Sequence, residues 1–148
     1  MALATALLAV SLAGCPGPTF VVQQYTGPVR PKDTIATLRV NGSDAVRIAT
    51  LDSEEIGAPI ASDSRLHIEL LPGRHAVTAQ STAAPTESTD PIVFQAEAGK
   101  VYRVAFVGNA PHLYEVDREA DAVIRDITPS APAPAPAPAD PPPLGFRR

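Results

Sequence analysis

The sequence predicts an all-β fold, a small antiparallel β-sandwich of about seven or eight short strands. Between residues 34 and 128, apolar and polar residues alternate with the two-residue period of β-strands. Clusters of Gly, Pro, Asn and Asp divide this pattern into short runs, as turns do. No long segment of this body has the 3.6-residue period of a helix. A body of about 95 residues is large enough to bury a core without disulfides.

The first four predicted strands are expected to form two hairpins. A loop over residues 41–45 would place Val40 opposite Val46, and a Pro72-Gly73 turn would place Leu70 opposite His75. In both registers inward-facing positions meet, which is the condition that fixes strand register. The residues predicted to face inward are Ala36, Leu38, Val40, Val46, Ile48, Leu66, Ile68, Leu70, His75, Val77, Ala79, Ile92, Phe94, Ala96, Tyr102, Val104 and Phe106.

Two stretches of the body are expected to be loops. Residues 52–64 are polar and irregular, with Ile56 and Ile60 available to plug the core. Residues 80–90 are rich in Ser and Thr and are long for a hairpin connection. Both stretches would lie on the surface, where connecting segments usually run.

The end of the body is expected to hold two further strands. Gly99 and the residues 108–111 supply turns, since glycine adopts backbone conformations closed to other residues. Strands are then predicted over 113–116 and 122–127. For the last of these, a short helix over residues 118–125 is the alternative.

The N-terminus ends an apolar run with Leu12-Ala13-Gly14-Cys15. The run is about half the roughly 20 residues that a helix needs to cross a bilayer, and it has the form of a signal-peptide core. The tetrapeptide resembles the bacterial lipobox, although no Lys or Arg precedes the run. The resemblance implies cleavage before Cys15 and attachment of acyl chains such as palmitate to that residue. In the family with this motif, Asp after the cysteine is the inner-membrane retention signal. Pro16 stands at that position here, so the resemblance favours the outer membrane on its periplasmic side.

Two alternatives to the lipid anchor remain open at this point. The apolar run could be a buried N-terminal helix with a core cysteine, because free cysteines are often buried. It could also be a signal peptide that is cleaved without lipid attachment.

Composition divides the chain into four parts. Residues 1–14 are predicted to be a lipoprotein signal peptide, 15–33 a tether, 34–128 the β-sandwich and 129–148 a disordered Ala/Pro-rich tail. The tether contains too many glycines and prolines to predict regular structure. Its Phe20-Val21-Val22 segment would either dock on the domain or lie near the membrane.

The tail ends in Phe146, Arg147 and Arg148. As a stiff polyproline arm it would present these residues to an acidic surface, such as another envelope protein, peptidoglycan or anionic head groups. The alternative is a disordered tail with no target. The chain as a whole has a net charge of −4 and no basic stripe, which argues against a nucleic-acid partner.

No residue pattern predicts catalysis or a bound metal. His67 and His75 are the obvious metal pair, but the predicted register puts them on opposite faces. Glu115 and Asp117 share a strand face and could bracket a cation, with a solvated acidic face as the simpler interpretation. The sequence has no Gly-x-Ser-x-Gly elbow or phosphate-binding glycine loop. We therefore expect no catalytic residues, no metal and no cofactor.

Several motifs of the body are similar to those of small uncharacterised lipoproteins of Gram-negative bacteria, with a module like the PEGA and transthyretin-like domains. The motifs are Tyr25 to Pro28, Ala36 to Leu38, Leu71-Pro72-Gly73 and Ala98-Gly99-Lys100-Val101-Tyr102-Arg103-Val104. The chain departs from that pattern at Leu51-Asp52-Ser53, where Val-Asp-Gly is usual, and in its long tail. The resemblance implies a β-sandwich and carries no activity.

The function expected from the sequence is that of a membrane-anchored envelope lipoprotein with a non-catalytic structural or protein-binding domain. Partners would contact the 80–90 loop, an open sheet edge or the C-terminal residues. The alternative is a periplasmic sensor that binds a small ligand or a cation, at Glu115 and Asp117 or in a pocket at one end of the sandwich. A hydrolase would need a cleft with paired carboxylates, and none is identifiable.

Overall fold

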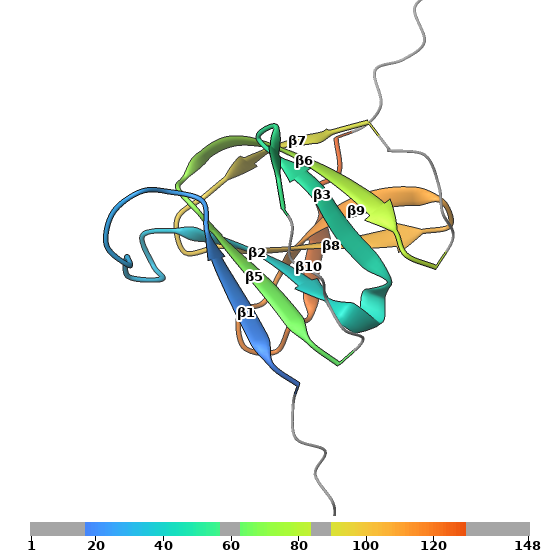
Figure 1. Ribbon diagram of the computed structural model, residues 1–148, viewed down its shortest axis with the longest axis horizontal. Coiled ribbons are helices and arrows are strands. Elements are labelled where there is room, and N and C mark those ends of the chain that lie inside the picture. Colours follow the sequence, from blue (N-terminus) through green and yellow to red (C-terminus); the bar gives the residue numbers. More distant parts are fainter. Residues whose placement is uncertain (1–16, 57–62, 84–89, 130–148) are drawn as a thin grey trace, which may run out of the picture.

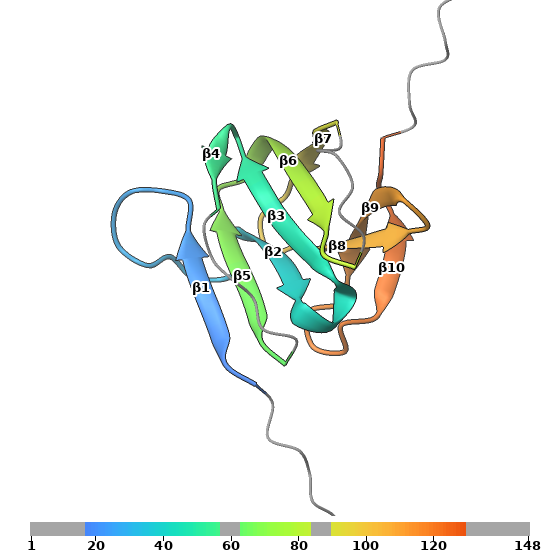
Figure 2. The ribbon, with the colours of Figure 1, turned by 45° about the vertical axis from the view of Figure 1, so that its right-hand side comes forward.

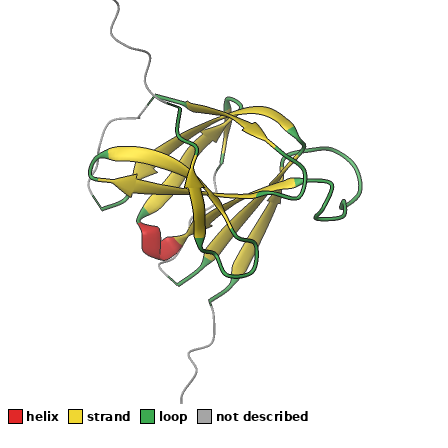
Figure 3. Ribbon diagram, turned by 180° about the vertical axis from the view of Figure 1, so that it is seen from behind, coloured by secondary structure: helices red, strands yellow, loops and turns green. Residues whose placement is uncertain are grey.

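The computed structural model describes residues 17–56, 63–83 and 90–129. They form ten β-strands and one 3-10 turn, η1 (Gly42–Asp44), which Figure 3 shows between β2 and β3. The strands are β1 (Thr19–Gln23), β2 (Ala36–Asn41), β3 (Val46–Leu51), β4 (Glu54–Glu55), β5 (Arg65–Leu70), β6 (Gly73–Ser81), β7 (Ile92–Ala96), β8 (Val101–Val107), β9 (Ala110–Val116) and β10 (Val123–Asp126). The predicted all-β fold is confirmed.

Two sheets enclose a common core (Figures 1 and 2). The larger has the strand order β1-β5-β2-β8-β9-β10, and the smaller has the order β4-β3-β6-β7. The core is mainly aliphatic and draws on both sheets, with Phe94 and Tyr102 meeting edge to face at 5.3 Å between ring centroids. The inward-facing positions predicted from the alternation are buried, apart from Phe106 and His75, which are partly buried.

Both predicted hairpins are wrong. β2 and β3 belong to different sheets, as do β5 and β6. Val40 lies opposite Leu66 on β5, and His75 lies opposite Phe94 on β7. The inner faces of both sheets are apolar, so matching apolar positions does not distinguish a neighbour in the sheet from a strand across the sandwich.

The turns between these strands carry the chain from one sheet to the other. Ala45 ends η1 in the left-handed conformation, with φ 52°, before β3 begins. Gly73, with φ 150°, opens β6 after the predicted Pro72-Gly73 turn. The connection at Gly99, with φ 77°, likewise joins β7 in the small sheet to β8 in the large one.

At the end of the domain, sequence neighbours do pair. β8 and β9 form a hairpin in which Val107 lies opposite Ala110, so the turn is shorter than predicted. β10 pairs with β9, which confirms the last predicted strand and shows that the helical alternative over residues 118–125 is wrong.

Two segments expected to be irregular contain strands. Residues Thr19–Gln23, inside the predicted tether, form β1 at the edge of the large sheet. Residues Glu54–Glu55, inside a predicted loop, form β4, and Ile56 is buried beside them.

The sheets are also not wholly antiparallel. Both β1 with β5 and β2 with β8 are parallel pairs. Because parallel neighbours need a long crossover, these pairings join segments that are far apart in the chain.

Candidate functional site

A row of mainly polar side chains, with two arginines at its centre, crosses the outer face of the large sheet. Leu38 and Val40 are fully buried, so Arg39 between them points away from the core. The strand registers place His67 and Arg103 on either side of Arg39. Across the whole sheet the row reads Val21, His67, Arg39, Arg103, Tyr114 and Asp126.

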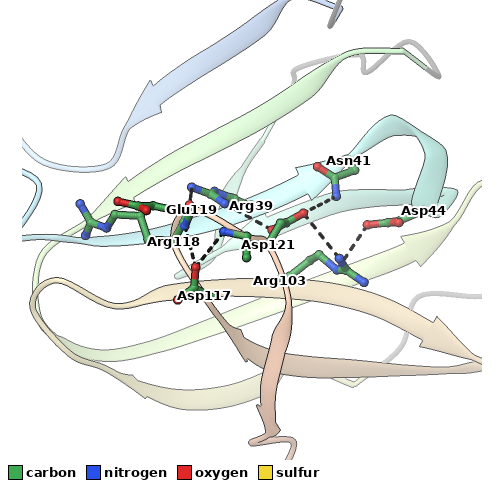
Figure 4. Close-up of polar contacts among 9 residues, drawn as sticks. Arg39, Asn41, Asp44, Arg103, Asp117, Arg118, Glu119 and Asp121 are labelled. Atoms are coloured by element: carbon green, nitrogen blue, oxygen red, sulfur yellow. Dashed lines mark hydrogen bonds and ion pairs between the residues drawn. The ribbon is translucent and has the colours of Figure 1, made fainter. Parts of the chain in front are cut away.

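Asp121 separates the two arginines of this row. Like charges directly opposite each other on neighbouring strands are destabilising. One carboxylate oxygen of Asp121 accepts a hydrogen bond from Arg39 at 3.3 Å, and the other accepts one from Asn41 at 3.3 Å and lies 3.6 Å from Arg103 (Figure 4). The carboxylate therefore offsets the repulsion between the guanidinium groups.

The β9–β10 loop holds Asp121 in place. Asp117 accepts hydrogen bonds from the backbone N–H groups of Glu119 and Ala120, which closes a tight turn. These bonds lower the pKa of Asp117. Asp121 itself has φ 53°, a left-handed conformation that Asp tolerates better than most residues. Arg118 ties the loop to the rest of the domain by donating hydrogen bonds to the carbonyl oxygens of Lys32 and Gly99, at 2.8 and 2.7 Å.

Between this loop and the sheet lies a pocket of about 300 Å³, which we call the arginine pocket. Its walls are Arg39, Asn41, Arg65, His67, Arg118, Glu119, Ala120 and Asp121. A smaller recess of about 50 Å³ shares Arg39, His67 and Arg118 with it and adds Lys32.

Several buried polar atoms in and beside the arginine pocket have no hydrogen-bond partner among the described residues. Arg39 Nε is buried and makes no hydrogen bond within the described part of the chain. Arg103 Nε and Asp44 Oδ2 are buried in the same way and lie 3.7 Å apart, too far for a hydrogen bond. Arg39 is thus held by Asp121 and the Arg118 carbonyl while one of its donors stays free.

The surroundings of His67 indicate a positive local potential. Burial lowers the pKa of His67 below its ordinary value of 6.5, the charges of Arg39, Lys32 and Arg65 lower it further, and the charge of Asp121 opposes them in part. The imidazole is therefore neutral near pH 7. This potential belongs to one pocket of a chain whose net charge is negative.

The predicted site residues do not meet here. Cys15 and the C-terminal Phe146, Arg147 and Arg148 lie outside the described residues. His67 and His75 stand in different sheets, and His75 is bound to Asp52 at 2.6 Å. Within the described ranges, no group of three His, Cys, Asp or Glu side chains is placed to hold a metal ion.

Glu115 does not belong to a solvated acidic face, so that interpretation is wrong. It is only 2% exposed and binds Lys100 and Arg125, at 2.6 and 2.7 Å. The carboxylate of Asp117 is occupied by backbone N–H groups of its own turn. Each acid thus already has partners supplied by the chain.

Sequence reasoning missed the arginine pocket. The available signal was Arg39 and Arg103, two arginines at outward positions of strands whose inward positions are aliphatic. Asp121, their shared partner, is about 80 residues beyond Arg39 in a turn, and no spacing rule connects the two. Comparison with known protein families, with curated proteins and with solved structures gave no match.

Proposed function

We propose that this chain is a lipid-anchored envelope protein whose β domain is a non-catalytic recognition module held at the membrane surface. The anchor is Cys15, and the membrane is the outer membrane on its periplasmic side. Recognition takes place at the arginine pocket. In the part of the chain that the structure describes, no helix has the length and apolarity to span a bilayer.

The observation that carries the proposal is how soon the chain joins the domain after Cys15. A Cβ at Gly17 would lie 1.8 Å from the carbonyl oxygen of Asp63, so the backbone here is in close contact with the body. The carbonyl of Pro18 accepts the N–H of Arg65 at 3.0 Å. Two residues span at most about 7 Å, so an acylated Cys15 would hold the domain against the bilayer.

The same end of the domain carries the arginine pocket. Thr19, at the start of β1, is in register with Arg65, a residue of the pocket wall. β1 and β5 both begin at this end, whereas the C-terminal end of the coloured ribbon lies at the opposite end (Figures 1 and 2). The tail with Phe146 would therefore start from the side away from the anchoring membrane, which favours an envelope partner other than that membrane.

The chemistry of the pocket supports binding rather than reaction. Its carboxylate Asp121 and its guanidinium Arg39 hold each other in fixed positions. His67 is the titratable base of the pocket. The other polar groups of the wall are guanidinium groups, one amide and the carboxylates of Glu119 and Asp121, and the wall contains no hydroxyl nucleophile. A site of this kind recognises charge and shape.

Lipidation is tested by expressing the full chain in a Gram-negative host and analysing the N-terminal peptide by mass spectrometry. The expected product starts at Cys15 and carries acyl chains, and Cys15→Ser abolishes both cleavage and acylation. A secreted, water-soluble protein that is free of fatty acids and still carries residues 1–14 would contradict the proposal. In-cell crosslinking of the same two proteins would identify partners that depend on the anchor.

The short linkage is tested by Gly17→Ala. The added methyl group has no room beside Asp63, so the segment before β1 must move away and the Arg65 N–H should lose its partner. Amide hydrogen exchange at Arg65 should then accelerate. Thr19→Ala, at an exposed position two residues further on in β1, should leave that exchange rate unchanged.

A further inference from the structure

The free polar groups of the arginine pocket have opposite charges. On the sheet side, Arg39 Nε is unpaired, and the Arg65 and His67 side chains make no hydrogen bond or ion pair with another described residue. On the loop side, the exposed Glu119 carboxylate is likewise unpaired. Each oxygen of Asp121 already accepts one hydrogen bond, from Arg39 or from Asn41, so Glu119 is the carboxylate of the wall that has no partner among the described residues.

Such a pocket fits a small molecule that carries an anion and a cation. An arginine guanidinium binds phosphate oxygens through paired hydrogen bonds, and a carboxylate accepts hydrogen bonds from an ammonium group. The volume of about 300 Å³ is at the lower end of the range for small-molecule sites, which suits a head group.

We propose that the arginine pocket binds a phosphate–ammonium zwitterion, the group carried by phosphoethanolamine and by phosphatidylethanolamine head groups. The phosphate would lie against Arg39, Arg65 and His67, and the ammonium against Glu119. The bilayer as a source of this group rests on the proposed anchoring, since Arg65 lies beside the strand that follows Cys15. A soluble phosphoethanolamine compound has the same chemistry, and the experiment below separates the two sources.

The test uses the full chain purified in detergent micelles, with O-phosphoethanolamine and inorganic phosphate as probes and calorimetry as the measurement. O-Phosphoethanolamine should bind, and Arg65→Gln should weaken its binding about tenfold, the loss expected for one charge-assisted hydrogen bond. Arg74→Gln is the matched control, because Arg74 is an exposed arginine on β6 in the other sheet. It should leave the affinity unchanged.

Glu119→Gln gives the most specific outcome. It should weaken binding of O-phosphoethanolamine, which loses its ammonium partner, and strengthen binding of inorganic phosphate, which loses a repulsive neighbour. Glu119 is exposed and its side chain has no partner among the described residues, so the variant should keep the fold. Three results would overturn the proposal. They are that neither probe binds, that Arg65→Gln and Arg74→Gln have equal effects on affinity, or that Glu119→Gln changes the affinity for both probes in the same direction.

The source of the ligand is decided by NMR of the His67 side chain in lipid nanodiscs. A bound phosphate should raise the pKa of His67, since an anion stabilises the protonated imidazole. The same increase in phosphatidylethanolamine discs, but not in phosphatidylglycerol discs, supports the lipid head group. An increase with free O-phosphoethanolamine alone supports a soluble ligand. Because the free-probe measurements need no anchor, they stand even if Cys15 proves not to be acylated.

Discussion

The large sheet holds charges in two contrasting ways. At Glu115 a carboxylate that is 2% exposed is bound by Lys100 and Arg125 at 2.6 and 2.7 Å. In the arginine pocket, Asp121 meets Arg39 and Arg103 at 3.3 and 3.6 Å. The Glu115 cluster is closed, because the chain supplies short contacts to both carboxylate oxygens. The arginine pocket is open, because the contacts of its carboxylate Asp121 are longer and Arg39 Nε remains unpaired among the described residues.

The difference separates a structural ion cluster from a candidate binding site. A buried charge is tolerated when its partners and hydrogen bonds are complete, and it is then fixed in one arrangement. A cluster in which hydrogen-bond donors are unpaired can bind a ligand through those donors, but its own internal contacts stabilise the fold less. We therefore expect substitutions at Glu115 to affect mainly stability and substitutions in the arginine pocket to affect mainly binding.

The largest expected effect is that of Glu115→Gln. The neutral amide loses the charge-assisted bonds to Lys100 and Arg125, so the free energy of unfolding should fall by about 2–3 kcal/mol. Urea denaturation of the two proteins at pH 7 measures this difference. A loss as small as that of Asp33→Asn, an exposed carboxylate without a side-chain partner in the described residues, would show that the cluster is not structural.

The same cluster should make stability depend on pH. The hydrogen bond from Lys100 is the main cause that lowers the pKa of Glu115 in the folded protein below its ordinary value of 4.5. The stabilisation is thus complete above pH 4.5 and declines as the pH falls below that value, where the unfolded chain takes up a proton first. Denaturation midpoints of wild type and Glu115→Gln should converge in acid. A constant gap down to pH 3 would contradict this reasoning.

Asp121→Asn should have a smaller effect on stability, about 1–2 kcal/mol, because its contacts are longer and partly solvated. The substitution leaves Arg39 and Arg103 opposite each other without a carboxylate between them. The β9–β10 loop should open, and amide exchange at Asp121 should accelerate. If its unfolding free energy fell further than that of Glu115→Gln, the division into a closed and an open cluster would be wrong.

The smallest effect concerns Asp126, an exposed carboxylate that adds a third case to the comparison. The hydroxyl of Thr128, together with His112 and the Thr128 N–H, lowers the pKa of Asp126 to about 2. Thr128→Val removes the first of these bonds, so that pKa should rise toward 3.8. NMR titration of the Asp126 carboxyl carbon measures the shift. Thr34→Val, whose hydroxyl binds the carbonyl of Pro31, should leave it unchanged.

The residues of the Glu115 cluster are easier to predict from the sequence than those of the arginine pocket. Lys100, Glu115 and Arg125 are close in the chain, and Glu115 was visible as a candidate, but its burial depends on the path of β8, β9 and β10. Arg39 and Arg103 come together only because β2 and β8 run parallel, which no local pattern predicts. The apolar Phe20-Val21-Val22 segment was a signal for β1, outweighed by the prolines around it.

By itself, the sequence determined the fold class and, for β2, β3 and β5 to β8, the side of the strand that faces the core. Successive side chains of a pleated strand point to opposite faces, so a short stretch of sequence such as Leu66, Ile68 and Leu70 is enough to show which face is buried. The tertiary structure alone decided which strands are neighbours. Both sheets have apolar inner faces, so the alternation does not specify which strand pairs with which. The arginine pocket depends on that choice, since its charges come from β2, β5 and a turn some 80 residues further on.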